Sequence, residues 1–377
     1  MADGGREVSL GWRGLTVRAW LPEKLQGRTV TLSERTVRST EQAAAAVREI
    51  ASRVPTGFEP LARLLLRAEG LASSQVEQIR APIADVVLAE VYEGVGVAAH
   101  VADNLKVVKE ALVHASGTAP LTAEVLHAWH RQMMTHGSLP DGLIASWRSQ
   151  IGWIGGATPA EAVFVPAPPD SIERLMDDLL LTANACPWDP VTTAAVVHAQ
   201  FETIHPYADG NGRVGRVLAL WLLARKLEGV TVPPPMSVLI AQDTNSYIAA
   251  LGAFRIGMDD QLVHWFASVI IPAAHASINW AEKLDTLVDN WHGRTEGFRS
   301  DAASRRLLPI LARFPLLSAE IAAEQLGVTL PAARNGLDAL VETGIVIDHG
   351  TVASGPGRPR RWWSAPELLD LLRQGPM

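Results

Sequence analysis

One short stretch of the chain, His205–Arg216 (HPYADGNGRVGR), combines a titratable base, a carboxylate, a glycine-rich turn and two arginines. Glycine adopts positive φ and allows close backbone approach, so successive N–H groups in such a turn can form a concave anion site. A helix that begins at the turn adds the positive end of its dipole to the same place. The stretch therefore predicts a loop that binds phosphate groups.

Each side chain of this loop suits one part of a metal-bound triphosphate. Asp209 offers a hard oxygen ligand, which suits a Mg²⁺ ion that also carries phosphates and water. Arg213 and Arg216 are three residues apart, so on a helix they share a face and present planar forks to phosphate oxygens. His205 is the side chain whose ordinary pKa allows it to accept a proton near neutral pH. The alternative, a surface turn that caps a core helix, does not explain why these side chains have these offsets.

Two buried helices are predicted around the loop. Ala194–Thr203 is apolar and ends just before the histidine, and Val214–Lys226 is a second, strongly apolar segment. Similar helical periodicity recurs across residues 56–275, where one hairpin is predicted at Gly152–Val165. The sequence therefore predicts a helix–loop–helix inside a mainly helical domain.

The loop resembles the core motif of the Fic family, His-Pro-Phe-x-(Asp/Glu)-Gly-Asn-Gly-Arg-x-x-Arg, with Tyr207 in place of the phenylalanine. That exchange keeps an aromatic ring and adds a hydroxyl that needs a partner. The resemblance covers residues 60–280, including Phe201–Ile204 before the motif and the stretch 147–169. It implies a mainly α fold: a Fic-type helical bundle with a β-hairpin flap.

The resemblance also implies an activity, transfer of AMP from ATP to a Ser, Thr or Tyr hydroxyl of a target protein, with Mg²⁺ bound. It implies that His205 takes the hydroxyl proton and that Asp209 holds the metal. Ile154 and Gly155 in the flap would hold the target segment by backbone hydrogen bonds, as a strand adds to a sheet edge. The nucleotide-binding residues implied are Gly210, Asn211 (through its backbone and side chain), Gly212, Arg213, Arg216 and Tyr247.

A second resemblance lies upstream, near residues 66–80. Ser73 and Glu77 are four residues apart, hence neighbours on one helical face, and they resemble the family's inhibitory pattern Ser/Thr-x-x-x-Glu-Gly/Asn. The resemblance implies that Glu77 pairs with Arg216 and so takes the partner of the γ-phosphate. Gln78 departs from the pattern, which has Gly or Asn there. The alternative is a solvated glutamate on an amphipathic helix.

Composition predicts an intracellular protein. The chain has 377 residues, 48% of them hydrophobic and 19% charged, and a net charge of −7, which gives no general reason to expect nucleic-acid binding. The N-terminus lacks a signal pattern, and apolar runs such as Val217–Ala224 are short for a membrane span. We therefore expect a cytoplasmic protein without a membrane partner. His127, His130 and His136 have metal-like spacing, but no carboxylate or cysteine set completes a site.

The predicted organisation has four parts, the last of which reads as a separate module. That module resembles a winged helix-turn-helix, with helices at Ser318–Gln325 and Leu330–Thr343 and strands around a Gly/Pro-rich wing. Its acidic and basic residues roughly balance, so docking or dimer formation stays as open as DNA binding. Candidate DNA contacts are Arg334, Arg358, Arg360 and Arg361. The four parts are residues 1–55 (N-terminal region), 56–275 (Fic domain), 276–304 (connecting helix and linker) and 305–377 (winged helix-turn-helix).

Three alternatives to AMP transfer remain open at this point. The same site could remove AMP, with Glu77 positioning a water molecule. The donor could be a nucleotide other than ATP, because the sequence does not fix the base. The chain could also be a DNA-binding regulator whose Fic core senses nucleotide. AMP transfer implies a target protein as the partner. A homodimer is suggested only by the resemblance to the family.

Overall fold

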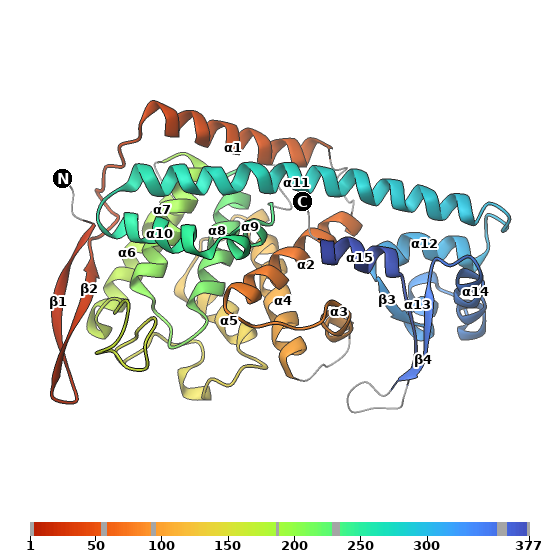
Figure 1. Ribbon diagram of the computed structural model, residues 1–377, viewed down its shortest axis with the longest axis horizontal. Coiled ribbons are helices and arrows are strands. Elements are labelled where there is room, and N and C mark those ends of the chain that lie inside the picture. Colours follow the sequence, from red (N-terminus) through yellow and green to blue (C-terminus); the bar gives the residue numbers. More distant parts are fainter. Residues whose placement is uncertain are drawn as a thin grey trace.

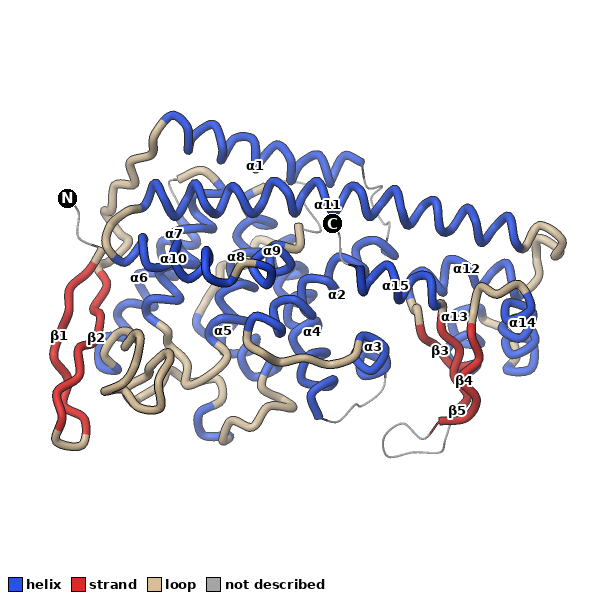
Figure 2. The backbone as a smooth tube through the Cα atoms, in the orientation of Figure 1, coloured by secondary structure: helices blue, strands red, loops and turns tan. Residues whose placement is uncertain are grey.

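The computed structural model describes residues 4–53, 59–91, 96–185, 188–227, 234–352 and 360–374. Helices dominate these residues, and the strands form one hairpin near the N-terminus and one small sheet near the C-terminus (Figures 1 and 2). The mainly α fold predicted from the sequence is therefore confirmed. The elements between the two sheets hold the predicted phosphate loop.

The N-terminal region contributes a hairpin and a long helix. Strands β1 (Gly5–Trp12) and β2 (Leu15–Pro22) pair antiparallel, and α1 (Glu34–Arg53) runs along the outside of the molecule. Figure 1 shows α1 lying side by side with the long helix α11 (Asp259–Arg294). Residues 28–32, between the hairpin and α1, do not form a strand.

The central bundle surrounds α7, whose residues from Val191 to Ile204 are all buried. Asp189 caps its start by accepting from the N–H groups of Val191 and Thr192, and Pro190 occupies the first helical position. A helix with apolar residues on every side belongs in the middle of a bundle. The helices around the phosphate loop are α4 (Gly96–Ser116), α5 (Ala123–Met133), α6 (Ile172–Ala185), α7 (Pro190–Ile204), α8 (Asn211–Lys226), α9 (Met236–Gln242) and α10 (Thr244–Arg255).

The predicted hairpin at residues 152–165 is only partly formed. Ile154 and Phe164 make a single isolated bridge, and two short 3-10 turns, Asp141–Leu143 and Pro169–Ser171, flank this region. Consecutive glycines with positive φ, Gly155 (70°) and Gly156 (74°), bend the chain directly after the bridge. A two-stranded ladder cannot extend through such a bend, so the flap is a loop closed by one bridge.

Helix α11 crosses the expected domain boundary at residues 275/276 without a break. In the described part of the chain it is long and apolar enough to span a membrane by length and composition alone; its most apolar window has a mean hydropathy of 1.2 and is 50% buried. The sequence prediction considered only short apolar runs and did not include a helix of this length. Leu262, Phe266 and Ile270 on its inner face belong to the main core.

The C-terminal part has the order helix, strand, two helices, then a strand pair and a last helix. Its core is not separate, because Leu64 and Leu65 of α2 (Glu59–Val76) and Trp280 and Trp291 of α11 belong to the same buried cluster. The C-terminal part therefore shares its hydrophobic core with two helices that precede residue 305 in the chain. Its elements are α12 (Ala303–Arg313), β3 (Leu316–Ser318), α13 (Ala319–Leu326), α14 (Leu330–Glu342), β4 (Ile347–Val352), β5 (Arg360–Ser364) and α15 (Pro366–Gln374), with sheet order β3-β5-β4.

Helix α2 (Glu59–Val76) links this C-terminal core to the central bundle, and the short helix α3 (Ile83–Val91) packs against α4. One half of α2 contributes leucines to the C-terminal core, while its last turn lies next to α8. In Figure 1 α2 lies between the bundle and α15. A single helix therefore contacts both the C-terminal part and the predicted phosphate site.

Candidate functional site

The predicted helix–loop–helix is present. His205 ends α7 in the left-handed conformation (φ 51°), with its N–H donating to the carbonyl of Phe201 at 2.8 Å. Gly210 (φ 75°) precedes α8, which begins at Asn211 and not at Val214 as expected. The N–H groups at the start of α8 have no acceptors within the helix and face the loop, as an anion site requires.

Asn211 shapes this loop through its side chain. Its side-chain oxygen accepts from the N–H of Tyr207 at 2.8 Å, and its amide group donates to the carbonyl of Tyr207 at 2.8 Å. The residue is 2% exposed. Both polar atoms therefore make hydrogen bonds inside the protein, and a contact of this side chain with phosphates stays a prediction.

Two histidines of α5 contact residues of the loop. The hydroxyl of Tyr207, which the family pattern lacks, lies 3.1 Å from Nδ1 of His127. The His130 ring stacks on the Tyr207 ring with 3.9 Å between the ring centroids. Nε2 of His130 lies 3.0 Å from the carbonyl of Asp209, and Nδ1 of His130 accepts from the N–H of Ala145. Burial lowers the pKa of His130 to about 4, so the neutral ring donates from Nε2. These histidines position the loop and do not form a metal site.

Arg148 fixes the end of α7 behind the catalytic candidate. Its guanidinium donates to the carbonyls of His205 (2.8 Å), Ala167 (2.6 Å), Ile204 (3.2 Å) and Gln150 (2.8 Å). It is 4% exposed. Sequence reasoning placed Arg148 in the flap region but missed this role, which depends on carbonyls far away in the chain.

His205 is held neutral in this environment. Burial and, to a lesser extent, the positive charge of Arg148 lower its pKa to about 4, and Glu77 acts in the opposite direction. The His205 side chain is 20% exposed. A neutral imidazole at pH 7 can accept a proton, which is what a general base needs.

Asp209 is exposed at the outer side of the loop, and its Oδ1 accepts from the N–H of Gly210 at 2.6 Å. No group of three or more potential ligands for a metal occurs among the described residues. One exposed carboxylate fits a Mg²⁺ ion whose other ligands are phosphates and water, and it does not fit a metal held by protein alone. The residues present therefore suit a metal that arrives with a nucleotide.

The two motif arginines face different partners. Arg213, which is 1% exposed, contacts Nε2 of His100 on α4. Arg216 donates from Nε to the hydroxyl of Ser73 (2.9 Å) and from one terminal nitrogen to the carbonyl of Ser73 (2.8 Å) and to Oε1 of Glu77 (3.0 Å). The structure thus brings both upstream residues, Ser73 and Glu77, to Arg216. The pair is asymmetric, because Arg216 is 2% and Glu77 38% exposed.

The Glu77 carboxylate also covers the start of α8. A β-carbon added to Gly212 would lie 2.1 Å from Oε1 of Glu77, so only glycine allows this approach. An anionic oxygen at a helix N-terminus beside an arginine has the surroundings that a phosphate oxygen would have. Glu77 therefore occupies the predicted anion site.

Gln78 completes the turn that presents Glu77. Its φ is 61°, and the N–H groups of Gln78 and Ile79 donate to the carbonyls of Gln75 (2.9 Å) and Ser74 (3.0 Å). This is a Schellman motif, whose left-handed position favours glycine or asparagine. The position where the chain departs from the family pattern is thus the strained one.

We expect Gln78→Gly to stabilise the protein by about 0.5–1 kcal/mol, because it removes left-handed strain. The measurement is the melting temperature. Gln75→Gly, in the helical part of the same turn, is the matched control and should destabilise the protein by about 1 kcal/mol. A lower melting temperature for Gln78→Gly would show that the observed turn does not form in solution.

Tyr247 lies beneath the site and is 5% exposed. Its hydroxyl is 3.0 Å from Nε2 of His198, whose Nδ1 is 2.8 Å from the carbonyl of Gly215 on α8. A carbonyl only accepts, so Nδ1 carries the proton and Tyr247 donates to Nε2. Tyr247 therefore supports α8, and its contact with a nucleotide stays a prediction.

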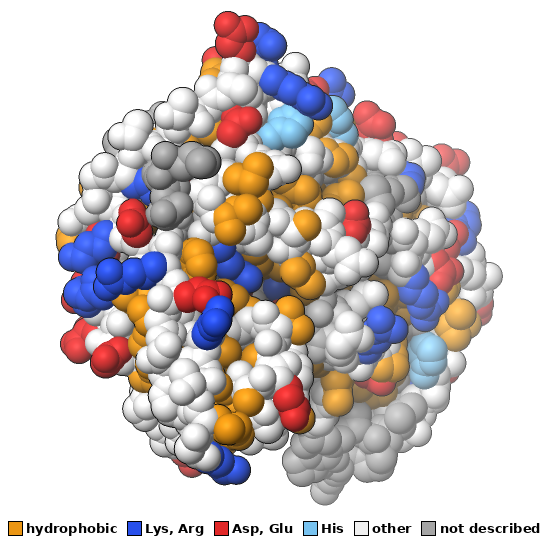
Figure 3. Space-filling model, turned by 60° about the vertical axis from the view of Figure 1, so that its left-hand side comes forward, with side chains coloured by type: hydrophobic (Ala, Val, Ile, Leu, Met, Phe, Trp, Pro, Cys, Tyr) orange, Lys and Arg blue, Asp and Glu red, His pale blue; other side chains and the backbone are white. Residues whose placement is uncertain are grey.

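The two flap residues expected to hold a target have different surroundings. Ile154 uses its N–H and its carbonyl within the flap, bonding to Phe164 and Val163, so Ile154 offers no free backbone group to a target. Gly155, with φ 70°, lies at the bend. A groove of about 370 Å³ separates the flap from β2, where the N–H of Trp20 donates to Val165. Figure 3 turns this end of the molecule forward and shows hydrophobic and charged side chains interspersed around a hollow.

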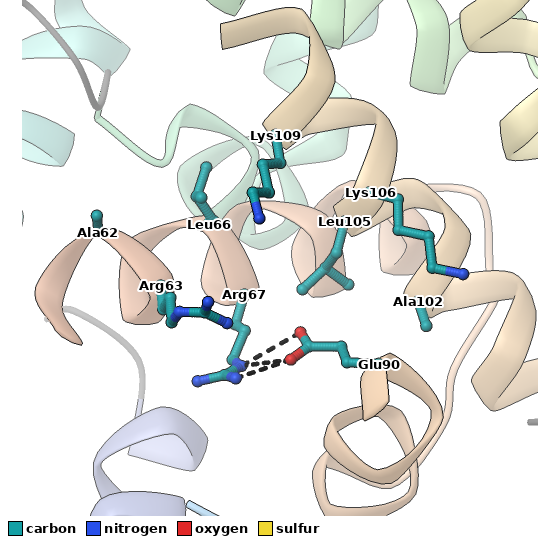
Figure 4. A pocket seen from close by; sticks show the side chains of 9 residues that line it. All are labelled: Ala62, Arg63, Leu66, Arg67, Glu90, Ala102, Leu105, Lys106 and Lys109. Carbon is teal, nitrogen blue, oxygen red and sulfur yellow. Dashed lines mark hydrogen bonds and ion pairs between the residues drawn. The ribbon is translucent and has the colours of Figure 1, made fainter. Parts of the chain in front are cut away.

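Helix α2 makes several buried polar contacts besides those with Arg216. Glu69, 3% exposed, accepts from the N–H of Ser237 (2.8 Å) and from its hydroxyl. Arg67 pairs with Glu90 of α3 at 2.7 Å and donates to a carbonyl of α12. Figure 4 shows this pair at one side of a cavity of about 270 Å³ between α2 and α4. These contacts hold α2 in place while its end presents Glu77.

The candidate DNA contacts have unequal surroundings. Arg361 is paired with Asp348 (2.6 Å) and Asp338 (3.1 Å), which neutralises its charge within the fold. Arg334 is exposed on α14, and Arg360 begins β5. Arg358 lies outside the described residues. The expectation that Arg361 is available to DNA is therefore not supported by its contacts.

Comparison with known proteins agrees with this geometry. Residues 120–223, which include the phosphate loop and the flap, match the model of the Fic/DOC family. This part of the chain is therefore similar to a Fic domain. The matched range ends within α8, so the Glu77 segment, Tyr247 and the C-terminal part lie outside it.

Curated relatives match over limited lengths. A probable protein adenylyltransferase from Aquifex aeolicus is 33% identical over 91 residues, which cover 24% of this chain and 26% of that protein. The protein adenylyltransferase fic-1 of Caenorhabditis briggsae is 30% identical over 119 residues, covering 28% of this chain and 22% of that protein. The chain therefore spans about a quarter of the length of these relatives.

Solved structures show the Fic fold over a larger part of the chain. A Fic family protein from Desulfovibrio desulfuricans aligns with a TM-score of 0.55 and 21% identity, covering 89% of this chain and 97% of that one. A Fic domain containing signaling protein from Bacteroides thetaiotaomicron aligns with a TM-score of 0.52 and 19% identity, covering 64% and 96%. The Fic-type helical fold is thus shown, including regions outside the family match.

Proposed function

We propose that this Fic protein is an adenylyltransferase that moves AMP from ATP to a hydroxyl of a target protein and that Glu77 restrains it. The observation that carries the proposal is the position of the Glu77 carboxylate. It pairs with Arg216 and lies against the start of α8 at Gly212, and the neutral His205 is part of the same site. A base next to an anion site is the arrangement that nucleotidyl transfer requires. The names of the Aquifex and Caenorhabditis relatives support the same reaction class.

In this mechanism, the target hydroxyl attacks the α-phosphorus of ATP while His205 takes its proton. The bond between the α-phosphorus and the oxygen that bridges to the β-phosphate breaks, and pyrophosphate leaves. The N–H groups of Gly212 and Arg213 at the start of α8, with the guanidinium groups of Arg213 and Arg216, would hold the phosphates and stabilise the charge on the leaving group. Arg148 keeps the end of α7 fixed, and with it the backbone of His205.

Asp209 would hold the Mg²⁺ that comes with ATP, because its carboxylate is exposed at the edge of the loop. When bound, the metal would neutralise phosphate charge. The carbonyl of Asp209 is engaged by His130 and its Oδ1 by the N–H of Gly210, so the residue's orientation is set from two sides.

Glu77 would restrain this reaction by occupying the place of the γ-phosphate. Withdrawal of all of α2 would expose leucines that complete the C-terminal core, such as Leu64 and Leu65. Unwinding of the last turn, from Ser73 onward, would not expose them. Release by local unwinding is therefore the less costly route, and the strained Gln78 lies within that turn.

The reaction is tested with ATP labelled at either the α- or the γ-phosphate. The Glu77→Gly protein is incubated with each label and Mg²⁺, and protein-bound label is measured. We expect label from the α-position only, because AMP retains that phosphate. Label from the γ-position would indicate phosphorylation instead, and no label with ATP bound would favour AMP removal or another donor.

The regulator alternative concerns the C-terminal part, whose element order agrees with the predicted winged helix-turn-helix. The pairing of Arg361 with two aspartates argues for a structural role. We expect Arg361→Ala to destabilise the protein by about 1 kcal/mol and to leave DNA affinity and its salt dependence unchanged. Arg334→Ala, which removes an exposed arginine of α14, is the comparison. A loss of salt-dependent binding in Arg361→Ala at unchanged stability would contradict this assignment.

A further inference from the structure

The ring of His205 has an unused nitrogen on its buried side. Its Nδ1 is buried and has no hydrogen-bond partner among the described residues. The nearest carboxylate is that of Glu202, whose Oε2 lies 3.8 Å from this nitrogen. Oε1 of Glu202 is likewise buried without a partner. Two complementary groups therefore face each other just beyond hydrogen-bond distance.

Glu202 is brought there by its place on α7. It lies three residues before His205, on the same face of the helix, and is 5% exposed. On its other side, a β-carbon at Gly215 would lie 2.1 Å from Oε1, so α8 packs its backbone directly on the carboxyl group. A carboxyl enclosed in this way has few orientations available, and its second oxygen, Oε2, is the one that lies 3.8 Å from His205 Nδ1.

The charged groups around Glu202 belong to the same site. Burial raises the pKa of Glu202 to about 7, Arg216 and Arg255 oppose that rise, and Glu77 adds to it. Burial lowers the pKa of His205 to about 4, and the charges of Arg148 and Arg255 act in the same direction. His205 is therefore neutral at pH 7, and the nitrogen that carries its single proton decides whether it can act as a base.

We propose that Glu202 is a positioning residue that accepts the Nδ1–H of His205, which leaves the Nε2 lone pair free for the target hydroxyl. The role of a carboxylate behind a catalytic imidazole is to fix its tautomer and orientation. The proposal rests on the function proposed above only for the identity of the proton donor. A rotation that shortens the 3.8 Å separation forms the bond.

One other acceptor could serve Nδ1. The backbone carbonyl of Glu202 also faces the ring and favours its protonated form. This carbonyl is present whatever side chain stands at position 202. Replacing the side chain therefore shows whether the carboxylate or the backbone carbonyl accepts the Nδ1–H.

The test is the tautomer of His205 at neutral pH, read from the nitrogen resonances of the ring in labelled protein, with His205→Ala used to assign them. We expect Nδ1–H in the wild type and a shift toward Nε2–H in Glu202→Met, which keeps the length of the side chain and removes the acceptor. Glu69→Gln is the matched control, because Glu69 is a second buried carboxyl near Arg216 that bonds to Ser237 and not to His205. An unchanged tautomer in Glu202→Met would assign Nδ1 to the backbone carbonyl and overturn the proposal.

Glu202→Gln provides a second readout if the methionine variant does not fold. In the Glu77→Gly background we expect its kcat for AMP transfer to fall on the order of tenfold with KM for ATP unchanged, because the weaker amide acceptor still aligns the ring. Glu69→Gln should leave kcat unchanged. An unaltered kcat in Glu202→Gln would contradict the proposal. An altered tautomer in a protein that never transfers AMP would instead reject only the proposed function.

Discussion

Glu77→Gly should raise self-modification with AMP by about 10- to 100-fold over the wild type when each protein is incubated with Mg²⁺ and ATP. The substitution removes the carboxylate that lies 3.0 Å from Arg216 and covers the start of α8 at Gly212. A hydrogen bond to a charged group contributes about 1.5–3 kcal/mol, which corresponds to this range in the population of the open site. Arg216 and the helix N-terminus then become available to phosphate.

Intact mass of the protein is the measurement, since addition of AMP is visible without knowledge of a target. Glu77→Gln is the matched control, because its amide keeps the shape of the side chain and can still contact Arg216. We expect it to fall between the wild type and Glu77→Gly. Equal modification of all three proteins would show that Glu77 does not limit the reaction.

The sequence predicted this loop well because its parts are local. His205, Gly210 and Arg216 lie within one short stretch, and the two flanking helices follow from apolar runs. The pairing of Glu77 with Arg216 was available only through the family resemblance, since no local pattern joins segments that far apart. The structure agrees with that pairing.

The residues that sequence reasoning missed act through long-range contacts. Arg148 bonds to carbonyls at the end of α7, and His130 bonds to the carbonyl of Asp209. Backbone carbonyls carry no side-chain signature, so no motif announces such contacts. Asn211 and Tyr247 were assigned to the nucleotide through the family resemblance. Their polar atoms make hydrogen bonds inside the protein, as burial requires.

The extent of the C-terminal core also depends on long-range contacts. The tail has its own helices and sheet, so its composition predicts an independent unit. Leu64 on α2 and Trp280 and Trp291 on α11 nevertheless complete its core. Apolar periodicity shows that a helix has a buried face but not which neighbour covers that face.

His205→Ala in the Glu77→Gly background should lower the rate of AMP transfer by about 100- to 10,000-fold, the range expected for a lost general base. Nucleotide affinity should change little, because the side chain approaches Glu202 and the end of α7 and forms no part of the anion site at Arg216. His275→Ala, which removes an exposed histidine of α11, is the control and should leave the rate unchanged. Intact mass against time gives the rate, and calorimetric titration with Mg·ATP gives the affinity. If His205→Ala lowers affinity and rate in equal proportion, the histidine supports nucleotide binding and another group must accept the proton.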